Sequence, residues 1–98
     1  MNQFMVEITL PGYLTQEFIE LIPEQRAFID SVMEKGVITG YMLALDRSKL
    51  WVTFRSRTTA DVIKILQAFP IAAYIEYTIS ELAFFNSAAS MVPSISLN

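Results

Sequence analysis

The spacing of apolar residues changes repeatedly along this 98-residue chain, and the order of those changes restricts the fold more than any single motif does. Apolar residues at every second position indicate a half-buried strand, whereas recurrence every three or four positions indicates the buried side of a helix. The chain reads as strand, helix, strand, strand, helix and strand. A chain of this length forms one domain with one core.

The first half of the pattern combines one strand with one long helical stretch. Apolar and polar residues alternate over residues 3–10, which predicts a strand. Helical spacing follows and ends at Gly36, a residue well suited to a helix C-cap. Pro23 lies inside this stretch, where its ring clashes with the preceding turn. We therefore expect a short helix over 15–21 and the main helix from residue 23 or 24, with one kinked helix as the alternative.

The second half of the pattern repeats the strand and helix with a hairpin in front of them. Residues 37–45 and 50–55 read as two strands joined by a tight turn. Thr58 has capping-box geometry at the start of a second helix, which Pro70 ends. Residues 73–82 alternate again and predict the last strand.

Two strand–helix–strand halves with right-handed crossovers place both helices on one face of an antiparallel sheet. The predicted fold class is therefore α+β, a ferredoxin-like βαββαβ sandwich with four strands, over residues 1–86. Residues 87–98 form a C-terminal tail with no clear period. Because several tail residues are aliphatic, we expect the tail to pack on a neighbouring subunit.

The sheet face away from the helices is expected to be covered by a second subunit. Apolar residues make up 53% of the chain and charged residues 17%, against about 45–50% and 25% in typical domains. A domain this small buries a modest share of its surface, so the surplus predicts a homodimer or a multiple of one. The predicted residues of this face are Met5, Glu7, Thr9, Trp51, Thr53, Arg55, Tyr74 and Glu76.

Several short motifs support a family resemblance over most of residues 4–85. They are Glu7-x-x-Leu10-Pro11, Arg26-Ala27, Glu34-Lys35-Gly36, Phe69-Pro70-Ile71 and Tyr74-Ile75-Glu76. In this order and spacing, the chain resembles the muconolactone isomerase-like proteins of the dimeric α+β barrel superfamily, which also holds the YCII-related proteins. The resemblance implies two sheets that meet face to face in a homodimer, and rings of dimers in the isomerases.

The resemblance also implies a chemistry. Muconolactone isomerases move a double bond in a small unsaturated lactone by proton transfer, without metal or cofactor. The implied ligand is a small organic acid or lactone, and Glu7 and Glu76 match acidic positions of the family. Two carboxylates in a partly dry cavity cannot both ionise easily, which suits general acid–base catalysis. Residues 38–42 differ from the basic and aromatic second strand of the isomerases, so the substrate stays open.

Five other residues are candidate substrate-binding groups. Arg55 is expected beside the two glutamates as a carboxylate anchor, with an interface ion pair as the alternative. Trp51, Tyr41 and Tyr74 can stack on an unsaturated substrate, with packing as the alternative. Arg26 is either a ligand anchor at the barrel rim or part of a solvated polar stripe on the first helix.

Composition excludes several other functions. The chain has no histidine and no cysteine, which removes Ser-His-Asp triads, thiol nucleophiles and the usual zinc and haem ligands. No metal or cofactor is therefore expected. No apolar run reaches the roughly 18 residues of a membrane helix. A net charge of −3 disfavours binding to nucleic acid. The missing leader segment predicts a cytoplasmic protein.

Two functions of different class remain as alternatives: a small isomerase-like enzyme and a non-catalytic oligomeric binding protein.

Overall fold

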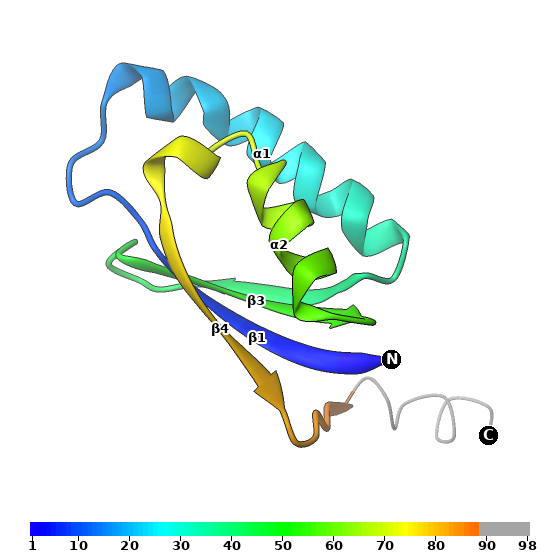
Figure 1. The fold of residues 1–98 in the computed structure, drawn as a ribbon. Coiled ribbons are helices and arrows are strands. Elements are labelled where there is room, and N and C mark those ends of the chain that lie inside the picture. Colours follow the sequence, from blue (N-terminus) through cyan, green and yellow to red (C-terminus); the bar gives the residue numbers. More distant parts are fainter. Residues whose placement is uncertain (89–98) are drawn as a thin grey trace, which may run out of the picture.

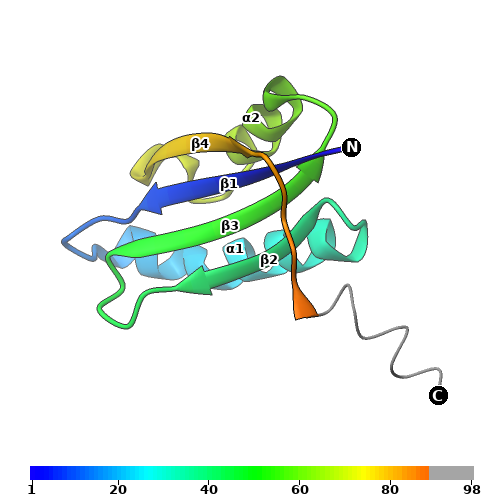
Figure 2. The same cartoon turned by 90° about the horizontal axis from the view of Figure 1, so that it is seen from below.

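A computed structural model describes residues 1–88 and places both helices on one face of an antiparallel sheet (Figure 1). The sheet has four strands in the order β2-β3-β1-β4, which confirms the predicted ferredoxin-like α+β fold. Figure 2 shows the sheet from the side that carries no helix. The elements are β1 (Asn2–Thr9), α1 (Gln16–Glu34), β2 (Ile38–Leu43), β3 (Lys49–Ser56), α2 (Thr59–Gln67), the short 3-10 helix η1 (Ala72–Tyr74) and β4 (Glu76–Leu82).

Helix α1 is one continuous helix, so the expected break before Pro23 is wrong. The helix begins after Thr15, whose hydroxyl accepts a hydrogen bond of 3.2 Å from the backbone N–H of Phe18. Pro23 lies on the exposed side, where the missing N–H removes one helical hydrogen bond. Phe18 before the proline and Ile29 after it both belong to the buried core. Packing on both sides of Pro23 outweighs the local preference for a break.

The predicted C-cap at Gly36 is confirmed. Gly36 has φ of 75°, a conformation that glycine adopts without steric cost. Its N–H donates to the carbonyl of Met33 at 2.9 Å, and the N–H of Val37 donates to the carbonyl of Val32 at 3.2 Å. This pair of bonds is a Schellman motif. It ends α1 and directs the chain into β2.

The core lies between the helices and the inner face of the sheet. Phe4, Val6 and Ile8 of β1 are fully buried, as are Val52 and Phe54 of β3. The register pairs Val6 with Val52 and Phe4 with Phe54, so one face of both strands is apolar. Each such buried side chain contributes roughly 1.5–3 kcal/mol to folding. The intervening residues of both strands therefore lie on the outer face, as predicted.

The last strand begins later than predicted, at Glu76, because η1 precedes it. Within η1, the ring of Tyr74 packs edge-on against Phe18 of α1, with ring centres 5.5 Å apart. The Tyr74 hydroxyl donates a hydrogen bond of 3.2 Å to the carboxylate of Glu17. Tyr74 is thus on the helix side, and its expected place on the outer face is wrong. The first turn of α1 offers this tyrosine an aromatic contact and an acceptor together.

Residues 83–88, which follow β4, run on the outer side of the sheet (Figures 1 and 2). Phe84 and Phe85 lie in this segment with exposed fractions of 79% and 39%. Residues 89–98 lie outside the described part of the chain, so the expected packing of the tail on a neighbouring subunit stays a prediction.

Over residues 1–88, neither helix is long and apolar enough to cross a lipid bilayer.

Candidate functional site

A cavity of about 550 Å³ lies between α1 and the end of the sheet where the β2–β3 hairpin turns. Its volume falls within the range of about 300–1,000 Å³ that small-molecule sites occupy. The wall is mainly aliphatic and comes from the inner sheet face, the buried side of α1 and the segment before η1. Its apolar residues include Phe18, Ile22, Ile29, Leu43, Leu50 and Ile71.

Five polar side chains line the same cavity: Gln25, Arg26, Asp30, Tyr41 and Arg47. The two arginines and the aspartate are exposed to solvent, so they surround the mouth. Tyr41 is 39% exposed, whereas Gln25 is only 6% exposed. The cavity therefore combines an apolar interior, one buried amide and a charged entrance.

The buried amide of Gln25 is only half paired. Its Oε1 accepts a hydrogen bond of 3.3 Å from the backbone N–H of Ile71. Its Nε2 is buried and has no hydrogen-bond partner within the described residues. A buried donor left unpaired costs roughly 1–3 kcal/mol. Because this nitrogen has almost no accessible surface, a molecule in the cavity does not reach it.

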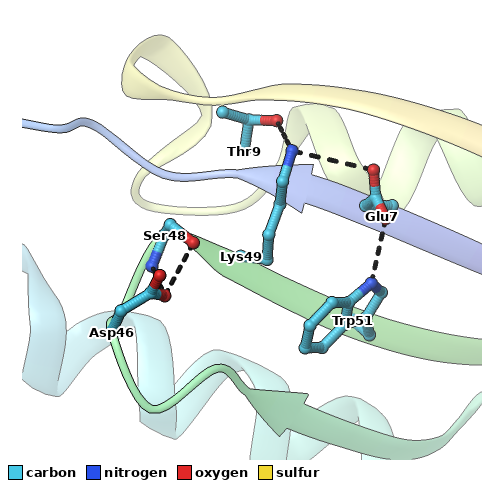
Figure 3. Close-up of polar contacts among 6 residues, drawn as sticks. All are labelled: Glu7, Thr9, Asp46, Ser48, Lys49 and Trp51. Carbon is cyan, nitrogen blue, oxygen red and sulfur yellow. Dashed lines mark hydrogen bonds and ion pairs between the residues drawn. The ribbon is translucent and has the colours of Figure 1, made fainter.

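Arg47 reaches the cavity from the hairpin turn between β2 and β3. Its φ of 63° is unusual for a residue other than glycine. The turn is fixed by Asp46, whose carboxylate accepts from the Ser48 hydroxyl at 2.7 Å and from the Ser48 N–H at 3.0 Å (Figure 3). These two hydrogen bonds hold the pKa of Asp46 below its ordinary value. The turn thus holds the backbone of Arg47 beside the entrance.

The outer face of the sheet carries a second polar cluster (Figure 3). The indole N–H of Trp51 donates to Glu7 at 3.1 Å. The Lys49 ammonium lies 3.7 Å from the other oxygen of the same carboxylate and donates to the Thr9 hydroxyl at 2.9 Å. Glu7 is therefore held by one indole and one ammonium group, on the side of the sheet opposite the cavity.

The strand register separates Arg55 from Glu7. Glu7 pairs with Trp51, whereas Arg55 pairs with Gln3, near the other end of β1. Arg55 forms no ion pair within residues 1–88. The expectation that Arg55 lies beside Glu7 is wrong within one chain, and Lys49 takes that place. A residue's neighbours across a sheet depend on register, which alternation alone does not fix.

Glu76 lies on β4 on the same outer face. It pairs with Thr9, and Glu7 pairs with Thr78. The two carboxylates are therefore diagonal neighbours, a relation that places their Cα atoms about 7–8 Å apart. This arrangement keeps both glutamates on one surface, and both are exposed in the single chain.

The predicted site residues therefore fall in three places. Arg26 and Tyr41 line the cavity. Tyr74 packs on α1 and supports its first turn. The remaining four, on the outer face, are Glu7, Trp51, Arg55 and Glu76.

The residue that sequence reasoning missed most clearly is Gln25. It lies on the apolar stripe of α1, between Ile22 and Ile29, where a buried aliphatic residue is expected. A polar residue on a buried stripe was a signal available in the sequence. Arg47 gave no such signal, since only the fold brings the hairpin turn to α1.

Within residues 1–88, no acidic side chains gather in a group of three or more that could hold a metal ion. The described polar groups of the cavity are an amide, a phenol, two guanidinium groups and one carboxylate. This set suits hydrogen bonding and anion binding.

The fold is similar to two solved enzyme structures. Muconolactone isomerase matches with a TM-score of 0.71 and 15% identity, over 88% of this chain and 93% of the isomerase. The 5-chloro-2-hydroxyhydroquinone dehydrochlorinase of Burkholderia phenoliruptrix AC1100, in complex with 2,5-dihydroxybenzoquinone, matches with a TM-score of 0.65 and 12% identity, over 90% of this chain and 97% of the enzyme. No protein-family model and no curated protein matches the sequence.

The chain thus belongs to the structural class of ferredoxin-like α+β proteins. Within that class it has the fold of muconolactone isomerase, and the resemblance in the sequence motifs is confirmed at the level of the fold.

Proposed function

We propose that this protein binds a small organic molecule in the cavity between α1 and the sheet. The observation that carries the proposal is the cavity itself, about 550 Å³ of mainly aliphatic wall with Arg26 and Arg47 at the entrance. An apolar interior with few polar groups is the usual form of a small-molecule site. Two guanidinium groups at the entrance favour an organic acid, because arginine pairs well with carboxylates.

The two similar folds support a small organic ligand. One belongs to an enzyme named for a lactone, and the other was solved with a dihydroxybenzoquinone bound. A ligand of that size is accommodated by the cavity of this protein. The proposal places it on the helix side of the sheet rather than on the outer face where the sequence had suggested it.

A thermal-shift titration with small organic acids and their neutral amides tests the proposal. A ligand that binds only the folded state stabilises it by about 2.7 kcal/mol at one hundred times its dissociation constant. Leu43→Trp should abolish that shift, because the indole would fill the cavity that Leu43 lines. Leu45→Trp is the matched control, since Leu45 is fully exposed. A ligand that stabilises the Leu43→Trp variant as much as the wild type would refute the location.

We infer self-association through the outer sheet face as a second part of the function. Trp51 is only partly buried in the single chain, Met42 is 50% exposed, and Phe84 is 79% exposed. Met42 and Trp51 pair across β2 and β3, and exposed apolar side chains that share a face favour an interaction site. A second copy of the chain on this face would cover the aromatic residues and enclose Glu7.

Enzymatic proton transfer is the alternative to simple binding, and it involves the outer face. Glu7 and Glu76 are diagonal neighbours there, and Lys49 supplies a positive charge. If Glu7 carries protons, Glu7→Gln should abolish turnover of any substrate found while the assembly stays intact. If Glu7 only holds an interface, the same change should weaken the assembly, because Lys49 loses its partner. Turnover assays combined with light scattering separate the two roles, with Glu81→Gln as the control.

A further inference from the structure

We propose that the cavity takes an aliphatic monocarboxylic acid, with the hydrocarbon chain in the interior and the carboxylate at the mouth. This inference rests on the proposed function, since it requires that the cavity binds a small organic acid. It adds the orientation of the ligand, and it excludes acids that carry a second charged group at the far end of the chain.

The residues that line the cavity divide by exposure into an interior and a mouth. The interior consists of apolar side chains that are at most 7% exposed, which are Phe18, Ile29, Leu50 and Ile71. The charged side chains and the phenol are all exposed, and these are Arg26, Asp30, Tyr41 and Arg47. Among the described lining residues, Gln25 is the one polar side chain that is buried.

Gln25 does not make the interior polar for a ligand. Its Oε1 accepts the hydrogen bond from the backbone N–H of Ile71, and its Nε2 has almost no accessible surface. The interior therefore offers a ligand no accessible side-chain donor from the described residues. A carboxylate placed there would lose its hydrogen bonds to water and gain no replacement, whereas a hydrocarbon chain has none to lose.

The mouth supplies what a single carboxylate needs. Arg26 comes from α1 and Arg47 from the β2–β3 turn, and neither forms an ion pair within residues 1–88. With Asp30 beside them, the mouth carries a net positive charge that one carboxylate neutralises. Guanidinium groups hold a carboxylate by charge-assisted hydrogen bonds, and the exposed position keeps its other oxygen lone pairs hydrated. The polar end of the ligand is therefore held at the mouth.

A purely structural explanation competes with this proposal. Aliphatic residues also line a cavity when they belong only to the core, and exposed arginines also serve solubility. In that case the affinity for an acid does not depend on the length of its hydrocarbon chain. The proposal predicts such a dependence, because each additional methylene group leaves water for the interior.

Calorimetric titration of the full chain with butanoate, hexanoate, octanoate and octanedioate tests the proposal. Affinity should rise by up to about fourfold for each methylene group added in the monocarboxylate series, which is the usual value of a buried methylene. Octanedioate has the length of octanoate with a second carboxylate at the far end. It should bind at least about tenfold more weakly than octanoate, because that carboxylate loses its water.

Two pairs of variants locate the hydrocarbon chain and the carboxylate. Leu43→Trp narrows the cavity and should abolish the rise with chain length, whereas Leu45→Trp, at a fully exposed residue, should keep it. Arg26→Gln should weaken all three monocarboxylates by a similar factor, about two- to fivefold for an exposed ion pair. Arg57→Gln removes the same charge at an exposed residue outside the cavity lining and should change none of the affinities.

The outcomes separate this inference from the proposed function. A rise in affinity from butanoate to octanoate that Leu43→Trp abolishes, together with weak binding of octanedioate, supports the inference. It is overturned by equal binding of octanoate and octanedioate, by affinities independent of chain length, or by affinities that Arg26→Gln leaves unchanged. The proposed function still stands in those cases if Leu43→Trp abolishes the binding of another small organic acid. Acid binding that Leu43→Trp does not alter, or no binding of any small organic acid, overturns both.

Discussion

At the scale of single residues, the entrance of the cavity carries an unfavourable backbone conformation. Arg47 has φ of 63°, which costs a residue with a Cβ on the order of 1–3 kcal/mol. The neighbouring Asp46–Ser48 hydrogen bonds hold the turn in this form. Strain of this kind is often retained where it positions a functional side chain.

We predict that Arg47→Gly keeps the free energy of unfolding unchanged or raises it by up to about 1 kcal/mol, because glycine adopts positive φ freely. The same change should weaken the binding of organic acids, since it removes one guanidinium group from the entrance. Chemical denaturation and calorimetric titration measure the two effects. Arg57→Ala removes the same charge away from the cavity and should leave affinity unchanged. Unaltered affinity in Arg47→Gly would exclude Arg47 from ligand recognition.

At the scale of elements, Tyr74 of η1 contacts Glu17 and Phe18 of α1 beside the cavity. The hydrogen bond to Glu17 raises the pKa of Tyr74 above its ordinary value of 10.0, and burial and the charge of Glu17 act in the same direction. The folded state thus favours the neutral phenol. The stability from this contact is complete below the unfolded pKa and is lost as pH rises through the higher folded pKa.

We predict that Tyr74→Phe lowers the melting temperature at neutral pH and removes part of the alkaline destabilisation seen in the wild type. The ring contact with Phe18 survives in this variant, so the change reports the hydroxyl alone. Melting curves from neutral pH to pH values above 10.0 provide the measurement. Tyr13→Phe, at a tyrosine that is 82% exposed, serves as the control. An alkaline profile identical to that of the wild type would contradict the assignment.

At the scale of the whole molecule, the two helices cover only one of the two faces of the sheet. The inner face is buried beneath both helices, whereas the outer face carries Trp51, Met5 and Met42 together with the Glu7 cluster (Figures 2 and 3). We predict that the protein is a dimer or a multiple of one in solution, with this face at the interface.

Trp51→Glu should convert that assembly to monomers, because it would place an unpaired charge at the centre of the interface. Light scattering at micromolar concentration measures the mass. Gln67→Glu adds the same charge on the exposed side of α2 and should leave the mass unchanged. A wild-type protein of monomeric mass would reject the proposed interface.

The amino-acid sequence by itself determined the order of the α-helices and strands, the caps at Gly36 and Thr58, and the faces of β1 and β3. These are local properties: a period of two or of 3.6 residues, a capping hydroxyl at Thr58 and a glycine at position 36 each act within a few residues. The hydrogen bond from the Asp61 N–H to Thr58 and the turn at Gly36 both appear as predicted.

Only the tertiary structure decided where the candidate functional groups meet. Gln25 reaches Ile71 across 46 positions of sequence, and Glu7 meets Trp51 across 44. Such pairs depend on strand register and on how α1 lies over the sheet, which no short segment specifies. For the same reason Tyr74 turned toward α1, and Arg55 lay away from Glu7. The period of the apolar residues predicts which face of an element a side chain lies on, whereas long-range packing determines which residues it contacts.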